Sequence, residues 1–236
     1  SFLAKNNRKF KEELSYFEKE IEDKSIPFNS NTEILILLYF YTNKLHLHFL
    51  EATFSEGEYL VEIINKKIET YKSRLDHHHV VILYYKIACL YFGMNKNKEC
   101  IAYLSKIINT KDLKVAEDLQ CFARVLNLIA HYECGLDYDL ERQFIDTYKF
   151  LLKMENLQEV QKEFITSIRD LSDVYPHEIK NEFKKIHTRL KKYENHPYEK
   201  RAFLYLDILS WLESKIENKP IEVIIKEKLN KRSKRF

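Results

Sequence analysis

Histidines are the first side chains whose type supports chemistry, because a neutral imidazole binds metals and transfers protons. Three of them are adjacent: His77, His78 and His79. Neighbouring residues on a helix point about 100° apart, so at most two of the three can share one metal ion. Asp76 precedes them and is expected to cap a helix that begins with this run. We therefore expect no metal site here.

Two other starts of catalytic motifs are incomplete. His177 and Glu178 begin the H-E-x-x-H zinc pattern, but Asn181 stands where the second histidine is needed. His131 lies three residues before Cys134, a spacing open to a nucleophilic thiol and its base. Both lie on one predicted helix, where we expect a packed thiol and a surface imidazole. The 3 glycines are isolated, which excludes Gly-rich phosphate loops. We expect a non-catalytic protein without a cofactor.

The composition favours a folded protein made of helices. Of the 236 residues, 45% are hydrophobic and 32% charged, as in ordinary globular proteins. Only 3 are glycine, against roughly 16 at average usage. Sandwiches, barrels and doubly wound sheets need many tight turns, whereas helices need few. A net charge of +3 gives no whole-chain attraction to nucleic acid or anionic membranes.

The location of the chain is predicted from its cysteines and its apolar runs. The 4 cysteines include no C-x-x-C pair, so we expect buried thiols in a reducing compartment, the cytoplasm. The longest apolar run, 34–41, is too short to span a bilayer. The sequence starts at Ser1, without a Met, so we also consider that it is the C-terminal part of a longer chain.

Apolar residues recur with the period of an α-helix from end to end. Ile179, Phe183, Ile186 and Leu190, for example, form one helical stripe. We predict one continuous all-α domain over 1–236. Its predicted helices are 2–22, 30–54, 58–75, 78–92, 96–109, 113–134, 138–154, 156–172, 177–194, 198–217 and 220–230. The prolines Pro176, Pro197 and Pro220 fall at predicted helix starts, Pro27 follows the first helix, and Asn218 is expected to cap the last.

The glycines indicate a repeat. Gly57, Gly93 and Gly135 each follow a long apolar helix, and the intervals between them are 36 and 42 residues. Five residues before them stand Ala52, Ala88 and Ala130. We expect each glycine to adopt positive φ and reverse the chain, and each alanine to let two helices approach. Helix pairs that recur every 34–47 residues or so are typical of helical solenoids.

One repeat resembles the tetratricopeptide family. Over residues 81–112 the family's small, aromatic and apolar positions are filled by Ala88, Tyr91, Cys100, Leu104 and Ile107. The family's turn glycine is displaced to Gly93, and its terminal proline is absent. The resemblance implies a right-handed superhelical array of about 10–11 antiparallel helices. Armadillo-like or irregular helical repeats remain open alternatives.

A second resemblance covers roughly residues 80–220. The segments 131–138, 148–151 and 207–215 are similar to those of uncharacterised helical-array proteins of Bacteroidetes bacteria. This resemblance implies the same tetratricopeptide-like architecture and brings no activity with it.

A tetratricopeptide-like array implies a concave face, lined by the first helix of each pair, that binds a peptide or protein. The register set by the three alanines places seven residues on that face. They are Phe49, Thr53, Tyr85, Cys89, Arg124, Asn127 and His131. Such a mixture of aromatic and polar groups can anchor a peptide. Packing between repeats is the alternative role for the same residues.

These observations leave three hypotheses for the function. The first is a protein-interaction scaffold whose partner the sequence does not name. The second is a helical-repeat module of a larger sensor or transcription regulator, and the third is an all-helical enzyme. Basic residues are concentrated near the end of the chain, over 226–235. They are the only feature that favours nucleic acid, and the balanced charge elsewhere argues against it. We expect no membrane contact, and the sequence does not indicate an oligomeric state.

Overall fold

The computed structural model describes residues 2–110, 117–135, 137–153, 159, 162–164, 166–167, 178–194 and 207–233. Throughout these ranges the chain is helical or in turns and forms no strand, which confirms the all-α prediction for this part. The elements are α1 (Phe2–Glu22), α2 (Ser30–Leu35), the π-helix η1 (Ile36–Tyr41), α3 (Thr42–Glu51), the 3-10 turn η2 (Ser55–Gly57), α4 (Tyr59–Thr70), α5 (His77–Gly93), α6 (Asn97–Ile108), α7 (Glu117–Glu133), α8 (Asp137–Leu151), α10 (Ile179–Lys191), α12 (Ile208–Glu217) and α13 (Ile221–Ser233). Within the same ranges, no helix is both long and apolar enough to cross a membrane.

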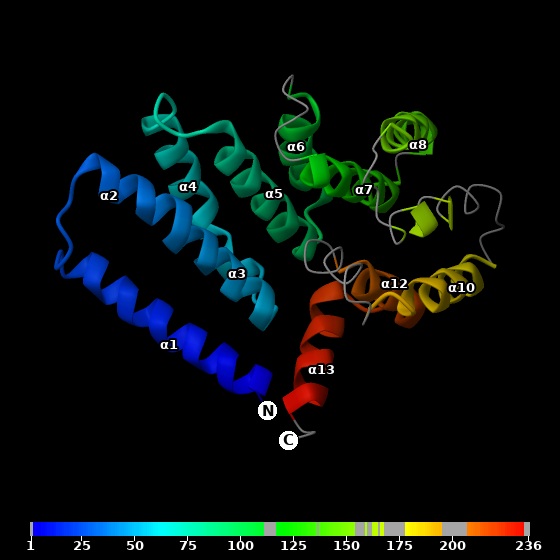
Figure 1. Ribbon diagram of the computed structural model, residues 1–236. Helices are drawn as coiled ribbons and strands as arrows, with labels where there is room; N and C mark the ends of the chain where they lie inside the picture. Colours follow the sequence, from blue (N-terminus) through cyan, green and yellow to red (C-terminus); the bar gives the residue numbers. More distant parts are fainter. Residues whose placement is uncertain are drawn as a thin grey trace.

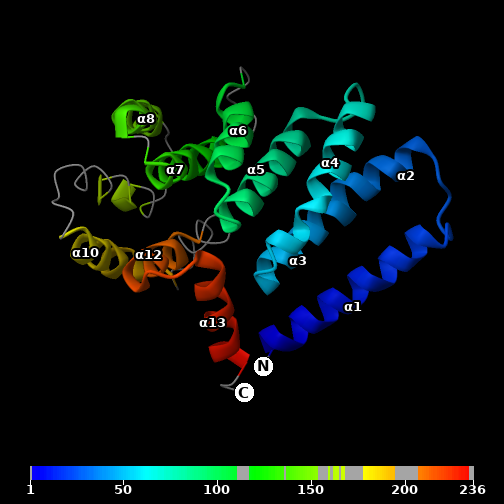
Figure 2. The same cartoon turned by 180° about the vertical axis from the view of Figure 1, so that it is seen from behind.

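The helices follow one another around an arch. In Figures 1 and 2 the chain passes from α1 over α4, α5 and α6 to α8, and then back through α10 and α12 to α13. The helices bury two large hydrophobic core clusters, one centred on α3–α5 and one that extends from α5 to α12. Ile225 and Leu229 of α13 pack against the α3–α5 cluster, so the last described helix returns to the first half of the chain.

Most predicted helices have a counterpart in the structure. The predicted 78–92, 96–109 and 220–230 correspond closely to α5, α6 and α13, and Pro220 directly precedes α13 as expected. Asp76 caps α5, because its carboxylate accepts a hydrogen bond from the His79 backbone N–H at 3.0 Å. The predicted helix 156–172 lies mostly outside the described residues, as do the first part of 198–217 and the prolines Pro176 and Pro197.

The prediction that each glycine takes positive φ is wrong for two of the three. Only Gly135 does so, at φ +64°. Gly57 lies in the 3-10 turn η2 and Gly93 is the last residue of α5. The left-handed residues at the ends of α3 and α5 are instead Ala52 (φ 51°) and Asn95 (φ 60°). The three alanines are therefore not equivalent, because Ala52 follows α3 whereas Ala88 and Ala130 lie within α5 and α7. The predicted alignment of the three helices on their alanines does not hold for α3.

Close packing explains Gly57 and Gly93. A Cβ atom on Gly93 would lie 2.3 Å from Cδ1 of the Phe54 ring, and one on Gly57 would lie 2.9 Å from the His48 ring. Both glycines thus let the turn after α3 contact its neighbours, a role that depends on missing side-chain volume and not on backbone freedom. Asn218 also differs from its prediction. It ends α12 in the left-handed conformation (φ 54°) and does not cap α13.

Trp211 of α12 connects α7, α10 and α12 through aromatic contacts. Its side chain is 2% exposed, and its ring contacts those of Tyr132, Phe164 and Phe183 at centroid distances of 6.2, 6.1 and 5.7 Å. The indole Nε1–H donates to Oε1 of Glu133 at 2.6 Å, and Lys215 pairs with the other carboxylate oxygen. A single half-buried carboxylate therefore joins the end of α7 to α12.

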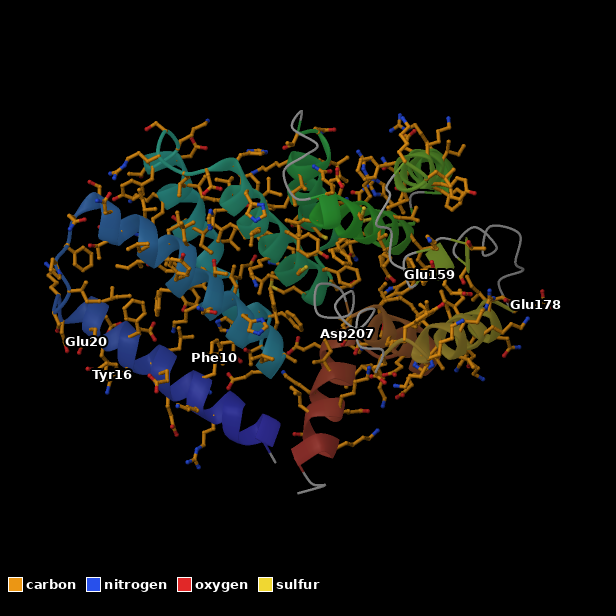
Figure 3. The ribbon with its side chains drawn as sticks, in the orientation of Figure 1. Phe10, Tyr16, Glu20, Glu159, Glu178 and Asp207 are labelled. Atoms are coloured by element: carbon orange, nitrogen blue, oxygen red, sulfur yellow. The ribbon has the colours of Figure 1, made fainter. Side chains whose placement is uncertain are left out.

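A second polar network joins α10, α12 and α13. Glu213 on α12 accepts from His187 Nε2 at 2.9 Å and from Lys228 Nζ at 2.8 Å. Lys228 also donates to the Ser210 hydroxyl at 2.8 Å. Ser210 in turn donates to Asp207 at 2.5 Å, and Asp207 caps α12 through the Ser210 backbone N–H at 2.9 Å. Asp207 stands at the start of α12 in Figure 3.

This network predicts that the stability of the fold decreases at low pH. Burial raises the pKa of Glu213, but the hydrogen bonds and charges of His187 and Lys228 outweigh it and lower the pKa from 4.5 to about 2. A lowered pKa stabilises the fold above pH 4.5, and this contribution is lost as the pH falls from 4.5 through 2. We expect Glu213→Gln to cost about 2 kcal/mol at pH 7, less than the full shift because solvent screens part of the pair.

Urea unfolding of both chains between pH 7 and pH 3 tests this expectation. The difference in unfolding free energy between wild type and Glu213→Gln should shrink as the pH falls below 4.5. Glu182→Gln is a suitable control, because it removes a carboxylate whose one ion-pair partner among the described residues, Lys185, is exposed. A constant difference at all pH values would contradict the assignment of this carboxylate.

Candidate functional site

An open groove of about 670 Å³ lies over α4, α5 and α6. Its long wall is one face of α4, where Tyr59, Glu62, Lys66 and Glu69 recur at helical spacing. The remaining lining residues are Glu58, Val61, Asn65, Tyr91 and Tyr103. Tyr91 comes from α5 and Tyr103 from α6, so three helices build the groove. This is the larger of the two cavities that we describe.

Tyrosine rings form the floor of the groove. Tyr103 lies between Tyr84 and Tyr91, with ring centroids 5.8 and 5.7 Å away. Its hydroxyl accepts a hydrogen bond from the Asn65 side-chain amide of α4 at 2.5 Å. Because each ring contacts another ring or an amide, the floor is fixed before any partner arrives. Preformed aromatic surfaces bind with a small loss of conformational entropy.

The face of this tyrosine cluster already holds one cation. The ammonium group of Lys106 lies 4.4 Å from the Tyr103 ring centroid and 4.8 Å from that of Tyr84. Both distances are within the range of a cation–π interaction. The tyrosines of α5 and α6 are thus placed so that their ring faces attract positive charge.

The phenol groups of two of these tyrosines have a raised pKa. Burial raises the pKa of the Tyr91 phenol, and Tyr103, Glu58 and Glu99 add to the shift. Burial likewise raises the pKa of Tyr84, with a further contribution from Glu69. Both phenols, whose ordinary pKa is about 10, therefore stay neutral at pH 7.

The predicted site residues lie elsewhere, on α3, α5 and α7. Phe49 is half-buried in the α3–α5 cluster, with the Phe54 ring 6.0 Å away and the Lys86 ammonium 5.8 Å from its own ring. Thr53 follows α3, and its hydroxyl forms a 2.8 Å hydrogen bond with Nδ1 of His48. Both residues have local packing partners in the first half of the arch.

The two predicted residues of α5 differ in exposure. Tyr85 is 2% exposed and belongs to the core, so a bound peptide would not reach it in this structure. Cys89 is half-buried. Burial raises the pKa of its thiol to about 12, against smaller opposing effects of Tyr85 and Lys86. A thiol with that pKa is a poor nucleophile at neutral pH.

The predicted residues of α7 form a polar stripe. Arg124 lies with its guanidinium 4.1 Å from the Phe150 ring centroid, and burial lowers its pKa. Asn127 donates to Gln143 of α8 at 3.0 Å, and its backbone carbonyl accepts from Nδ1 of His131 at 2.8 Å. The Nε atom of Arg124 and Oδ1 of Asn127 are buried without a hydrogen-bond partner among the described residues.

The structure therefore does not bring the seven predicted residues into one open groove. None of them lines either cavity described here. Tyr85, Asn127 and His131 are buried, whereas Phe49, Thr53, Cys89 and Arg124 are half-exposed. The prediction of a surface imidazole at His131 is therefore wrong. Their role in binding a partner stays a prediction, and the half-exposed members are the ones on which it can be tested.

Sequence reasoning missed the residues of the α4–α6 groove. It followed the first helix of each pair and noted Tyr91 only as a marker of the repeat. The available signal was the outer face of α4, where an aromatic residue and several carboxylates recur at helical spacing from Glu58 to Glu69. That pattern is also typical of a solvated helix face. Only the neighbouring tyrosines of α5 and α6 make it a groove.

A second cavity, of about 510 Å³, lies where the ends of α5, α7 and α12 meet the start of α13. Both lysines that line it are already paired with carboxylates. Lys215 pairs with Glu133, and Lys219 lies 2.8 Å from both Glu217 and Glu227. Cations at helix C-terminal ends are also stabilised by the helix dipole. This cavity thus has a structural explanation, and the groove is the better candidate site.

Comparison with known proteins gives no relative, because no family model, curated protein or solved structure matches the chain.

Proposed function

We propose that this chain is a non-catalytic interaction scaffold that binds a peptide segment of a partner protein. We further propose that its helix pairs form a right-handed, tetratricopeptide-like solenoid. Contacts of α3 with α5, and of α5 with α7, support this architecture. In stacked helix pairs the first helix of each pair contacts the first helix of the next.

The observation that carries the proposed function is the open groove with its preformed tyrosine floor. Tyr59 stands at its edge with 53% of its side chain exposed. Aromatic side chains beside a concave surface are the usual anchors of protein interfaces. The groove runs along α4 from Glu58 to Glu69, about 16 Å at 1.5 Å per residue. That length accommodates about five residues of extended peptide.

Selection from a displayed random-peptide library tests the proposal. We expect enriched peptides to bind wild type at least roughly tenfold more tightly than Tyr59→Ala, because truncation of an aromatic anchor typically costs that much. Tyr16→Ala is the matched control. Tyr16 is a tyrosine of α1 with 65% exposure outside the groove, and its loss should leave affinity unchanged. Equal affinities of wild type and Tyr59→Ala would contradict the groove as the binding site.

The predicted concave residues need a different experiment. Tyr85→Ala would remove a core side chain, so lost binding in that variant would report on folding as well. Thr53→Ala and Arg124→Ala change half-exposed residues and separate the two effects better. If either variant weakens a selected peptide while Tyr59→Ala does not, the binding surface lies on the first helices and not on α4.

A further inference from the structure

The charged groups at the groove are close to balance. Two of the three glutamates that line it have a lysine partner: Glu58 pairs with Lys96 at 2.5 Å, and Glu69 lies 3.7 Å from the ammonium group of Lys72. The same wall also contains a lysine, Lys66. Net charge therefore favours neither an acidic nor a basic occupant, and the aromatic rings and their hydroxyl groups are left to select the ligand.

The phenol hydroxyls of the groove can donate hydrogen bonds to a ligand. The Tyr103 hydroxyl accepts from the Asn65 amide at 2.5 Å, so its own hydrogen is left to donate. Burial raises the pKa of the Tyr91 phenol, so this group also keeps its hydrogen at pH 7. The groove thus offers ring faces for apolar contacts and hydroxyl donors for carbonyl groups.

The lining of the groove restricts the way in which a peptide can dock. Peptides bind folded proteins as an added β-strand, as a helix in a hydrophobic groove, as a polyproline II segment on aromatic rings, or by acidic groups on arginine clusters. The described part of the chain has no strand that a peptide could extend. Val61 is the one aliphatic side chain among the described residues that line the groove, and none of them is an arginine. Docking on aromatic rings is the mode that agrees with this lining.

A proline-rich segment matches what the groove offers. The proline ring packs on an aromatic face, and its fixed φ holds the segment extended before it binds, which lowers the entropy cost. A polyproline II segment has no internal hydrogen bonds, so its carbonyl groups are available to phenol donors. Proline also has no backbone N–H that would need an acceptor in the groove. At 3.1 Å per residue, about five residues span the roughly 16 Å of the α4 wall.

We propose that the groove over α4, α5 and α6 binds a proline-rich segment of a partner protein in the polyproline II conformation. This inference rests on the proposed function and specifies the chemistry of its partner. Proline rings pack on Tyr59 and Tyr91, and a peptide carbonyl accepts a hydrogen bond from the Tyr103 hydroxyl. Because these contacts involve no charged group of the peptide, the affinity depends little on salt.

Fluorescence anisotropy with two labelled peptides tests the inference. One probe is hexaproline, and the other has alanine at every proline position; both have blocked ends and the same serine flanks. We expect hexaproline to bind at least roughly tenfold more tightly than the alanine probe. Its affinity should change by less than about twofold between about 0.05 and 0.5 M NaCl. Equal binding of the two probes, or a strong salt dependence, would overturn the inference.

Tyr103→Phe removes the hydroxyl donor and keeps the ring. We expect it to weaken hexaproline binding about three- to tenfold, the usual effect of one lost hydrogen bond. Tyr16→Phe is the matched control, because it makes the same change at a tyrosine of α1 that is 65% exposed and lies outside the groove. It should bind hexaproline like wild type. Equal affinities of the two variants would contradict the proposed contact, and circular dichroism checks that both variants fold.

The peptide selection separates this inference from the proposed function. Enrichment of proline among the peptides that depend on Tyr59 would support the inference. Selected peptides that depend on Tyr59 but contain no excess of proline would refute the proline-rich partner and leave the scaffold standing. If neither the selected peptides nor hexaproline bind in a way that depends on Tyr59, the groove is not the binding site and both proposals fail.

Discussion

Gly93→Ala is expected to destabilise the protein by about 2–3 kcal/mol, although alanine is normally the better helix residue. The new methyl group would lie 2.3 Å from the Phe54 ring, far inside contact distance. Phe54 is 5% exposed and packs within the α3–α5 cluster, so its ring cannot move without disturbing the core. Urea unfolding followed by circular dichroism measures the change.

Two further variants identify the cause of the loss. Gly135→Ala introduces the same methyl group where nothing lies within 4 Å, but at φ +64°, so it should cost only about 1 kcal/mol of backbone strain. Gly93→Ala/Phe54→Leu should recover part of the stability lost in Gly93→Ala, because a smaller side chain relieves the clash. A Gly93→Ala protein as stable as Gly135→Ala would show that the turn after α3 does not pack as described.

Trp211→Ala is expected to have the largest effect of any single change, about 4 kcal/mol. It removes a fully buried indole and its contacts with three aromatic rings, and it leaves the Glu133 carboxylate without its indole donor. Trp211→Phe keeps most of the buried ring but loses the hydrogen bond. It should cost about 2 kcal/mol, the usual value for a hydrogen bond to a charged group.

Thermal and urea unfolding of both variants, read by circular dichroism, test these values. Trp211 is the only tryptophan, so its fluorescence in wild type reports directly on the docking of α12 against α7. The emission should be that of a buried indole and should shift to the red in a single unfolding step. If Trp211→Phe is as stable as wild type, the bond to Glu133 does not hold the two helices together.

The groove over α4, α5 and α6 and the aromatic contacts of Trp211 have different expected roles, the first in binding and the second in stability. The α3–α5 half presents an open surface with exposed tyrosine and glutamate side chains. The α10–α13 half encloses its charged groups in pairs, and α13 carries Ile225 and Leu229 back onto the α3–α5 cluster. We therefore expect groove substitutions such as Tyr59→Ala to affect binding with little change in stability, and core substitutions such as Trp211→Ala to do the reverse.

The sequence by itself determined the class of fold. Scarce glycine and a 3.6-residue apolar period identified helices, because both follow from hydrogen bonds and side-chain faces within one segment. The bounds of α5 and α6 were predicted to within one residue at each end, since Asp76 caps one helix and apolar residues mark the buried face of both. Such local signals need no knowledge of neighbouring helices.

Tertiary structure alone decided how the turns and the groove are made. Gly57 and Gly93 were predicted to take positive φ, but Ala52 and Asn95 take that conformation. The two glycines instead lie against bulky neighbours, the His48 and Phe54 rings. The groove joins Tyr59, Tyr91 and Tyr103, three residues from three helices. Glu133 meets Trp211 across 78 residues of chain. Contacts between distant segments depend on how helices stack, and the pattern within each segment does not contain that information.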